Sequence, residues 1–271
     1  MTRIGIYQAS TGIDPARNAT DLVAAIHRAA GEGAAMLFTP EMSGLLDRDR
    51  SRAAQSIVAE SDDKVLAAVR EAAARSGVWV ALGSLAVARE DGRWANRAIV
   101  VDGSGAIAAR YDKLHMFDVD LDSGESWRES NAYVAGEQVV TVETPVGRLG
   151  LSICYDIRFP ALFESLGEAR CDVIAIPAAF TVPTGRAHWH VLQRARAIEA
   201  SAWVVAAAQV GRHADGRETF GHSLVVDPWG EVVLDMGDRG PDIAFAEIDR
   251  ERIEKVRSQL PSLANRRSIA N

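Results

Sequence analysis

The stretch Arg148-Leu149-Gly150-Leu151-Ser152-Ile153-Cys154-Tyr155-Asp156-Ile157-Arg158-Phe159-Pro160 decides the fold of this chain. Because side chains of a strand point alternately to its two faces, the stretch predicts a strand with Gly150, Ser152 and Cys154 on one face and aliphatic residues on the other. Cys154 then falls where the strand ends and the next helix begins.

The triplet Leu149-Gly150-Leu151 repeats Ile4-Gly5-Ile6, and the same order of elements follows each triplet. Periodicity and caps predict the following elements: in the first half, strands at 4–8, 36–39 and 78–84, helices ending near 33 and spanning 62–76, and a hairpin of 98–101 with 107–111; in the second half, helices at 161–169 and 187–201, strands at 173–176 and 202–205, and a hairpin turn at 225–230.

This duplication predicts the architecture of the whole chain. Each half has an apolar sheet face to bury, so the halves are expected to pack sheet on sheet with helices outside, as a four-layer α-β-β-α sandwich. Two independent α/β domains are the alternative, although no Pro- or Ser-rich linker separates the halves.

The composition excludes several classes of partner. The 271 residues include 30 Lys and Arg against 37 Asp and Glu, a formal net charge of −7. An acidic chain without a basic run lacks the positive surface that binds nucleic acids or anionic membranes, so neither is expected as a partner. Two cysteines are too few for a disulfide framework, and no leader or long apolar run is present, which predicts a cytoplasmic protein.

Signatures of nucleotide and metal sites are missing from the sequence. There is no Gly-rich phosphate loop, no dinucleotide fingerprint, no His-Glu-x-x-His and no Cys-x-x-Cys. His188 and His190 are the tightest histidine pair, but side chains two residues apart on a helix diverge. We therefore expect neither a cofactor nor a metal.

Cys154 is the candidate for a reactive residue. At a strand-to-helix turn a side chain is presented at the edge of the sheet, and the N–H of Tyr155 is free to bind an anion. A nucleophilic cysteine with an oxyanion donor beside it fits this position. A buried structural thiol and a redox-sensing thiol are the alternatives.

Two charged residues of the first half are placed to act on such a thiol. Glu41 follows the strand-ending Pro40, and Lys113 follows the second strand of the hairpin. A thiol needs a base or a cation beside it to react at neutral pH. Each of the two is, taken alone, equally compatible with a solvated surface charge.

These residues lie in three blocks, Pro40-Glu41-Met42, Tyr111-Asp112-Lys113-Leu114-His115 and Cys154 to Pro160, which resemble the catalytic blocks of the nitrilase superfamily of carbon–nitrogen hydrolases. The resemblance runs to about Pro261 and implies the same α-β-β-α sandwich, with residues 1–260 as one domain and 261–271 as a tail. It implies Glu41 as general base, Lys113 as oxyanion stabiliser and Cys154 as nucleophile. A match around Arg128-Glu129-Ser130-Asn131 implies that Glu129 positions Lys113 and the substrate.

The resemblance also indicates a substrate class. Cys-Tyr-Asp-x-Arg-Phe-Pro is typical of amidases rather than true nitrilases, and several stretches are similar to the deaminated-glutathione amidases, which release 2-oxoglutarate and Cys-Gly; these stretches are 187–189, 194–197, 211–213, 221–223 and 227–230. An ω-amidase acting on 2-oxoglutaramate and an N-carbamoyl amino acid hydrolase are the alternatives. A non-catalytic binding protein is the alternative from another class.

Four residues are candidates for substrate binding. Arg158 suits a substrate carboxylate because a guanidinium binds it through two hydrogen bonds, although a surface ion pair is the alternative. Phe180 and Thr181 are candidate pocket walls, and His188 either binds substrate or serves helix packing. The resemblance further implies a homodimer or higher homo-oligomer, in which the polar tail crosses to a partner subunit or else frays.

Overall fold

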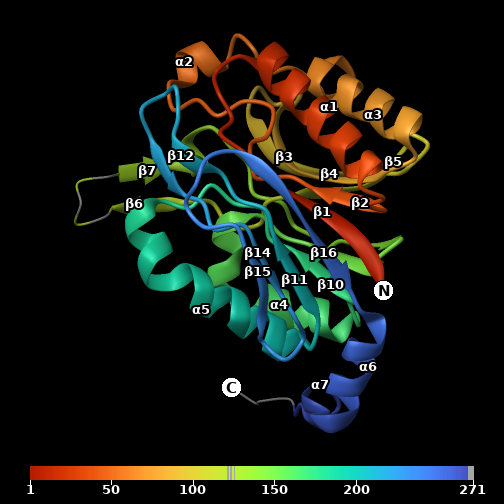
Figure 1. The fold of residues 1–271 in the computed structure, drawn as a ribbon. Coiled ribbons are helices and arrows are strands. Elements are labelled where there is room, and N and C mark those ends of the chain that lie inside the picture. The colour runs from red at the N-terminus through yellow and green to blue at the C-terminus, as the bar shows by residue number, and fades with distance from the viewer. Residues whose placement is uncertain (121, 123, 125, 268–271) are drawn as a thin grey trace.

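The structure, a computed structural model, describes residues 1–120, 122, 124 and 126–267 (Figure 1). The elements of the first half are β1 (Thr2–Gln8), α1 (Pro15–Gly31), β2 (Met36–Phe38), α2 (Arg50–Ala53), η1 (Glu60–Asp62), α3 (Lys64–Ser76), β3 (Trp79–Ala88), β4 (Trp94–Val101), β5 (Ile107–Asp112), β6 (Asp118–Asp120), β7 (Ser126–Arg128) and η2 (Glu129–Asn131). Those of the second half are β8 (Thr141–Thr144), β9 (Gly147–Leu151), η3 (Cys154–Arg158), α4 (Pro160–Glu168), β10 (Val173–Ala175), α5 (Val182–Ala200), β11 (Trp203–Ala206), β12 (Val210–Arg212), β13 (Glu218–Phe220), β14 (Leu224–Val226), β15 (Val232–Asp235), β16 (Asp242–Ile248), α6 (Arg250–Gln259) and α7 (Ser262–Asn265).

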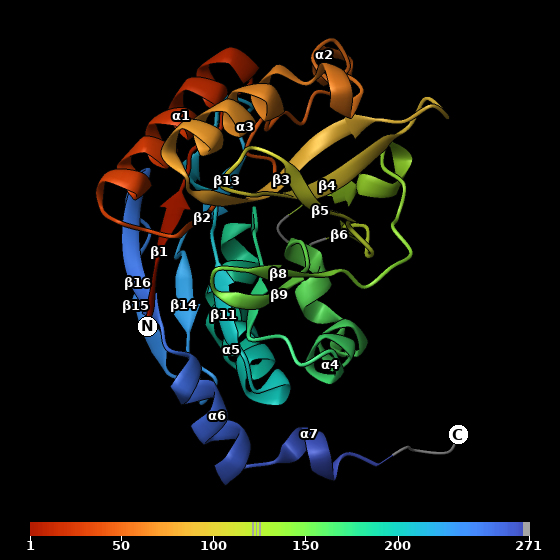
Figure 2. The same ribbon diagram turned by 90° about the vertical axis from the view of Figure 1, so that its right-hand side faces the viewer.

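Two six-stranded sheets form the centre of the molecule. Their strand orders are β16-β1-β2-β3-β4-β5 and β15-β14-β11-β10-β9-β8. Helices α1 and α3 lie outside the first sheet, and α4 and α5 lie outside the second (Figure 2). The expected four-layer α-β-β-α sandwich is thereby confirmed.

The helix limits follow from local chemistry. In α3, the Asp63 side chain accepts a hydrogen bond from the N–H of Leu66, and Gly77 ends the helix in a left-handed conformation with φ +69°. Helix α1 is amphipathic, so Leu22 and Ile26 are buried against the first sheet. Helix α3 and the end of α1 lie where the sequence predicts them, to within two residues.

The two halves share one hydrophobic core. Ile6 and Phe38 of the first sheet belong to the same buried cluster as Leu151 and Val225 of the second. Moreover, β16, from the end of the chain, pairs antiparallel with β1 along its full length and completes the first sheet. A description as two independent domains is therefore wrong.

Several elements differ from the predictions. Strand β9 ends at Leu151, so the alternation does not continue to Cys154, because the chain turns away to form η3. Helix α5 begins at Val182 rather than 187, since Pro183 is compatible with a first helical turn. Strand β16 was missed because its pattern of half-buried residues gives little alternation to read.

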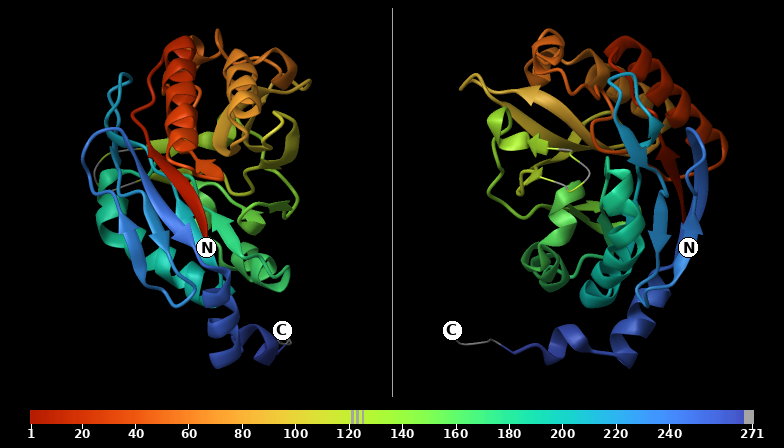
Figure 3. Two further views of the ribbon diagram at one scale, coloured as in Figure 1. Left: turned by 45° about the vertical axis from the view of Figure 1, so that its right-hand side comes forward. Right: turned by 90° about the vertical axis from the view of Figure 1, so that its left-hand side faces the viewer.

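The C-terminal segment leaves the body of the sandwich through α6 and α7 (Figure 3). Arg266 forms ion pairs with Glu164 and Glu168 of α4 in the same chain. The expected tail of 261–271 therefore contacts its own chain as far as Arg266, and residues 268–271 lie outside the described part. Among the described helices, none combines the length and the apolar character needed to cross a membrane.

Candidate active site

Cys154 opens the short helix η3 directly after β9. Its φ of +49° is uncommon for a residue with a side chain, and its N–H donates to the carbonyl of Pro177 at 2.8 Å. The first hydrogen bond of the turn runs from Asp156 N–H to the carbonyl of Ile153, which leaves the N–H of Tyr155 outside the turn. The backbone therefore presents a thiol with a donor group beside it.

Glu41 follows β2 and comes to the same place from the other half of the chain. Its Oε1 accepts hydrogen bonds from Lys113 Nζ at 3.0 Å and from Asn96 Nδ2 at 2.9 Å. Its Oε2 accepts from the N–H of Ala179 at 3.0 Å, and the Cys154 thiol is close enough to the carboxylate to lower the pKa of Glu41. The carboxylate is thus fixed between the cation and the thiol.

Lys113 bridges two carboxylates in the interior. Its Nζ lies 2.9 Å from Oε2 of Glu129 as well as 3.0 Å from Glu41 Oε1, and its side chain is 2% exposed. Glu129 begins η2, and its Oε2 also accepts the N–H of Phe117 at 2.7 Å. The structure therefore brings Glu41, Lys113, Glu129 and Cys154 together at one end of the two sheets.

The electrostatics of this cluster set the protonation state of each group. Burial disfavours an ionised Glu41, but Lys113 and the hydrogen bonds from Cys154 and Asn96 outweigh it and hold the pKa of the carboxyl below its usual value. Burial and the charge of Glu41 raise the pKa of the Cys154 thiol well above its usual value. Although burial lowers the pKa of Lys113, the charges of Glu129 and Glu41 raise it overall. The resting site thus holds a carboxylate, an ammonium and a neutral thiol.

Asn96 is a site residue that sequence reasoning missed. It lies on β4, is fully buried, and its Nδ2 donates both to Glu41 Oε1 and, at 3.0 Å, to Glu129 Oε1. The predicted strand 98–101 did not reach it, because β4 begins four residues earlier, at Trp94. Asn96 holds the two carboxylates at a fixed separation on either side of Lys113.

Asp156 was also missed, and it ties the two halves of the site together. Its Oδ2 accepts the Tyr111 hydroxyl at 2.7 Å and the N–H of Ile153 at 2.9 Å, and its Oδ1 accepts the N–H of His115 at 3.0 Å. Its side chain is fully buried. The turn that carries Cys154 is thereby fastened to the segment that carries Lys113.

A cavity of about 170 Å³ opens above the thiol. Arg158, Phe180 and Thr181 line it, as does Tyr155. The Arg158 guanidinium lies 5.4 Å from the Phe180 ring centroid, and the ion pairs of the described residues do not include it. His188 is exposed and outside the lining, and it contacts Arg158 through Nδ1 at 3.2 Å.

Another part of the cavity lining, whose role the sequence did not reveal, comes from strand β7 and two loops. Arg48 and Arg217 both lie over the ring of Trp127, at 5.6 and 4.9 Å from its centroid. Arg217 is paired with Asp215 at 2.7 Å. Cation–π contacts of this kind depend on where the loops meet, so no local pattern could have predicted them.

The arrangement suits nucleophilic attack on an acyl group. A neutral thiol lies beside an ionised carboxylate that can take its proton, and two donors, the Lys113 ammonium and the Tyr155 N–H, are near the sulfur. Glu41 and Lys113 come from the first half of the chain, and the thiol and the Tyr155 N–H come from the second.

Comparisons with known proteins agree with this geometry. The family model "Carbon-nitrogen hydrolase" matches residues 3–258. A deaminated glutathione amidase from Yersinia enterocolitica is 40% identical over 245 residues, covering 88% of this chain and 84% of the relative, and one from a Synechocystis strain is 39% identical, covering 89% of each. The crystal structure of the Caenorhabditis elegans NitFhit protein superposes with a TM-score of 0.90 at 36% identity, covering 98% of this chain and 65% of that one.

Proposed function

This chain belongs to the carbon–nitrogen hydrolase family and is an amide-hydrolysing enzyme, and we propose that Cys154 is its nucleophile, Glu41 its general base and Lys113 its oxyanion stabiliser. The observation that carries this proposal is the position of the Glu41 carboxylate, which is paired with the Lys113 ammonium and lines the same cavity as the Cys154 thiol. Glu129 is assigned to holding Lys113 and orienting the substrate.

In the first step, the thiol proton moves to the Glu41 carboxylate as the sulfur attacks the amide carbonyl carbon. Because the thiol is neutral at rest and the carboxylate is ionised, the proton has both a source and an acceptor. The carbonyl oxygen becomes an oxyanion. An ammonium has three N–H donors, so Lys113 serves its carboxylate partners and still donates to the oxyanion together with the N–H of Tyr155.

Collapse of this intermediate breaks the C–N bond. Glu41 returns its proton to the leaving nitrogen, which departs as an amine and leaves a thioester on Cys154. A water molecule then gives a proton to Glu41 and attacks the thioester carbonyl. When the second intermediate collapses, the acid product leaves and the sulfur regains its proton from Glu41, which restores the resting site.

The substrate that we propose is deaminated glutathione, cleaved to 2-oxoglutarate and Cys-Gly. Relatives that cover most of the chain bear this activity in their names. Arg158 lies at the cavity wall and suits one substrate carboxylate, with Phe180 and Thr181 beside it. His188, which is exposed outside the lining, is assigned to holding Arg158 rather than to the substrate itself.

A substrate panel tests this assignment. Purified enzyme is offered deaminated glutathione, 2-oxoglutaramate, an N-carbamoyl amino acid and a simple nitrile, and the release of acid or amine is measured. We expect the highest kcat/KM for deaminated glutathione. A preference for 2-oxoglutaramate would make the protein an ω-amidase, and failure to hydrolyse any amide, with no thioester trapped on Cys154 by mass spectrometry, would indicate a binding protein instead.

The chain is also proposed to form a homodimer. Residues 1–260 are proposed to be a single domain, followed by a tail of 261–271. The proposed location is the cytoplasm. Exposed apolar side chains gather on the outer side of α5 and the adjoining β14–β15 turn, where Val191 and Trp229 are 60% and 51% exposed and Ile198 contacts the turn. Light scattering checks this assembly: Ile198→Asp is expected to yield monomers, whereas truncation after Leu260 is expected to leave the dimer intact. Cell fractionation checks the location.

A further inference from the structure

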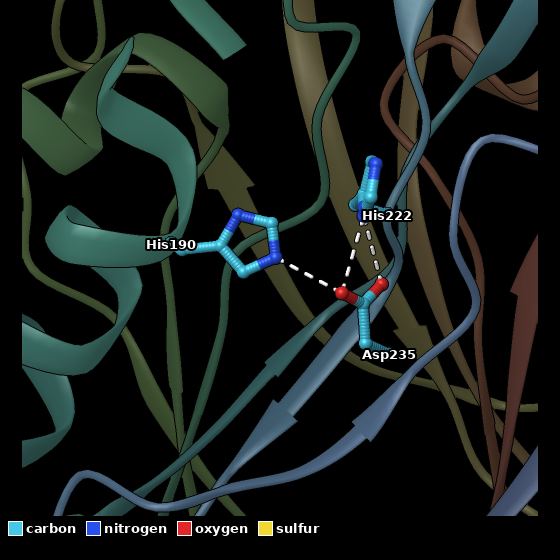
Figure 4. Close-up of side chains that lie close together, drawn as sticks. All are labelled: His190, His222 and Asp235. Atoms are coloured by element: carbon cyan, nitrogen blue, oxygen red, sulfur yellow. Dashed lines mark hydrogen bonds and ion pairs between the residues drawn. The ribbon is translucent and has the colours of Figure 1, made fainter. Parts of the chain in front are cut away.

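Two histidines and an aspartate converge at a place that the proposed reaction does not use. His190 is on α5, His222 is in the loop between β13 and β14, and Asp235 ends β15. Figure 4 shows both imidazole rings directed at the Asp235 carboxylate. His190 Nε2 lies 3.0 Å from Oδ2, and His222 Nδ1 lies 2.9 Å from Oδ1.

We infer that His190, His222 and Asp235 form a site for one divalent first-row transition-metal ion such as Zn²⁺. One donor atom from each residue can be chosen so that all lie within 4.8 Å of one another. In a tetrahedral zinc site with bonds of roughly 2.0–2.1 Å, neighbouring donor atoms are about 3.3 Å apart. The two histidine-to-aspartate separations are close to this value, and all three donor atoms lie within 4.8 Å, so side-chain rotation that draws the donors together would bring them to an ion.

The donor set determines which ion the site takes. Imidazole nitrogen suits zinc, copper and nickel, whereas magnesium and calcium prefer oxygen donors alone. The Asp235 carboxylate supplies one negative charge and, among the described residues, its ion pairs are with these two histidines and with no lysine or arginine. A dication therefore adds charge where it is attracted rather than repelled.

The His222 donor is held in place by its surroundings. Its backbone has φ +54°, and the conformation is kept by a hydrogen bond from Trp189 Nε1 to its carbonyl and by one from its own N–H to the Gly237 carbonyl, both at 2.8 Å. Trp189 is the neighbour of His190 on α5 and is fully buried. The helix that supplies one donor thus also fixes the loop that supplies another.

The site is open enough to fill from solvent. The side chains of His190, His222 and Asp235 are 40%, 23% and 32% exposed, which leaves a fourth coordination position accessible to water. The expectation of no metal rested on motifs and histidine pairs that are close in the sequence. Here the donors come from three elements, and His190 is 45 residues from Asp235.

An ion at this place would act on the wall of the active-site cavity. The Phe220 ring stacks on His222 with centroids 4.4 Å apart, and Thr219, its neighbour on β13, lines the cavity. Thr184, in the first part of α5, lines it too. Coordination by His190 and His222 would therefore link two segments of that wall.

The test is a titration of the full-length chain with Zn²⁺. The protein carries Cys154→Ala, so that the active-site cavity has no thiol that could bind zinc. Calorimetry is expected to show one ion bound per chain. His190→Gln and Asp235→Asn should each weaken binding by at least about tenfold, because each replaces an imidazole or carboxylate donor with a weaker neutral amide. His27→Gln, which changes an exposed histidine on α1, should leave binding unchanged.

Co²⁺ provides a second readout in the same proteins. Visible absorption typical of tetrahedral cobalt is expected in the parent and in His27→Gln and is expected to be absent in His190→Gln and Asp235→Asn, whose folding is checked by circular dichroism. The inference is overturned if the parent shows no saturable binding, or if the two donor variants bind zinc as tightly as His27→Gln. These outcomes are independent of amide hydrolysis, since binding is measured without substrate.

Discussion

The Lys113 ammonium lies 3.0 Å from Oε1 of Glu41, and both side chains are almost completely buried. Each of the two sets the protonation state of the other: Lys113 keeps Glu41 ionised, and Glu41, with Glu129, keeps Lys113 charged. Because Cys154 adjoins the same carboxylate, this pair decides where the thiol proton can go.

Replacement of Lys113 by methionine should reduce kcat by roughly a hundredfold or more, because an oxyanion donor is lost. It also leaves Glu41 and Glu129 buried without their cation, so the free energy of unfolding should fall by about 3–5 kcal/mol. Steady-state kinetics and urea unfolding measure the two effects. The control is Lys64→Met, an exposed lysine at the start of α3, which should change neither. Near-normal kcat in Lys113→Met would remove Lys113 from the mechanism.

Substitution of Asn96 by leucine should alter the pH dependence of hydrolysis. The pKa of Glu41 lies below 4.5 in the folded protein, so kcat/KM should stay on its plateau down to that range and fall at lower pH as the base is protonated. Loss of the Asn96 hydrogen bond raises the pKa of Glu41, which moves the acid limb to higher pH. A pH–rate profile detects the shift, and Asn131→Leu, at an exposed asparagine, is the control. An unmoved acid limb would contradict the positioning role.

The same pKa has a consequence for stability. Since the pKa of Glu41 is lower in the folded state than in the unfolded state, its ionisation stabilises the fold at pH values above about 4.5, and this contribution is lost as the pH falls through the folded-state pKa. The difference in unfolding free energy between the native protein and Glu41→Gln should therefore shrink in acid. Urea unfolding at a series of pH values measures it, and a difference that grows in acid would have the wrong sign.

Asp156→Asn should destabilise the protein by about 1–3 kcal/mol, because buried donors from Tyr111, Ile153 and His115 lose a charged acceptor. Tyr111→Phe removes one of these bonds and should cost less. Urea unfolding compares the two with Asp238→Asn, an exposed aspartate. If Asp156→Asn were as stable as this control, the hydrogen bonds that Asp156 accepts would not stabilise the contact between the Cys154 turn and the Lys113 segment.

Iodoacetamide should distinguish the two cysteines. Burial raises the pKa of Cys171 to about 12, and its side chain is fully buried, so it should not react near pH 8. Burial raises the pKa of Cys154 as well, but Cys154 lines the cavity, so the reagent can reach it and Glu41 can take its proton as the sulfur reacts. Glu41→Gln should slow the reaction by about tenfold or more. Glu218→Gln, a different carboxylate of the cavity wall, is the control. Mass spectrometry locates the label, and equal labelling of both thiols would contradict the assignment.

Arg158→Leu should raise KM for a carboxylate-bearing amide about tenfold or more, since a hydrogen bond to a charged group contributes about 1.5–3 kcal/mol. Hydrolysis of a small amide without a carboxylate should change little in the same variant. The two substrates compared in one enzyme separate loss of carboxylate binding from loss of structure. Equal losses with both would remove Arg158 from substrate recognition.

Local patterns in the sequence were sufficient for most of the fold. The period of two at Ile4–Gln8, the aspartate before α3 and Gly77 after it act on neighbouring residues, so their effect can be read without the rest of the chain. The repeated order of elements then predicted the sandwich. Strand β16 escaped because its stability comes from pairing with β1, at the other end of the chain.

The grouping of Glu41, Lys113, Glu129 and Cys154 was accessible from the sequence because each lies in a block that resembles a known family, at an element boundary. The roles of three other features could not be predicted from the sequence, because each depends on the side chains that it contacts. These features are Asn96, Asp156 and the cation–π group of Arg48, Trp127 and Arg217. A hydrogen bond between residues tens of positions apart has no local signature.

The sequence by itself thus determined the layers of the sandwich and singled out the side chains proposed to react, because periodicity, capping and turn chemistry act over a few residues. Only the tertiary structure decided the protonation states of those side chains. It also decided that Asn96 donates to two glutamates and that the side chains of His190, His222 and Asp235 lie close together. These depend on burial and on distances between remote segments, and such quantities exist only once the two sheets have packed.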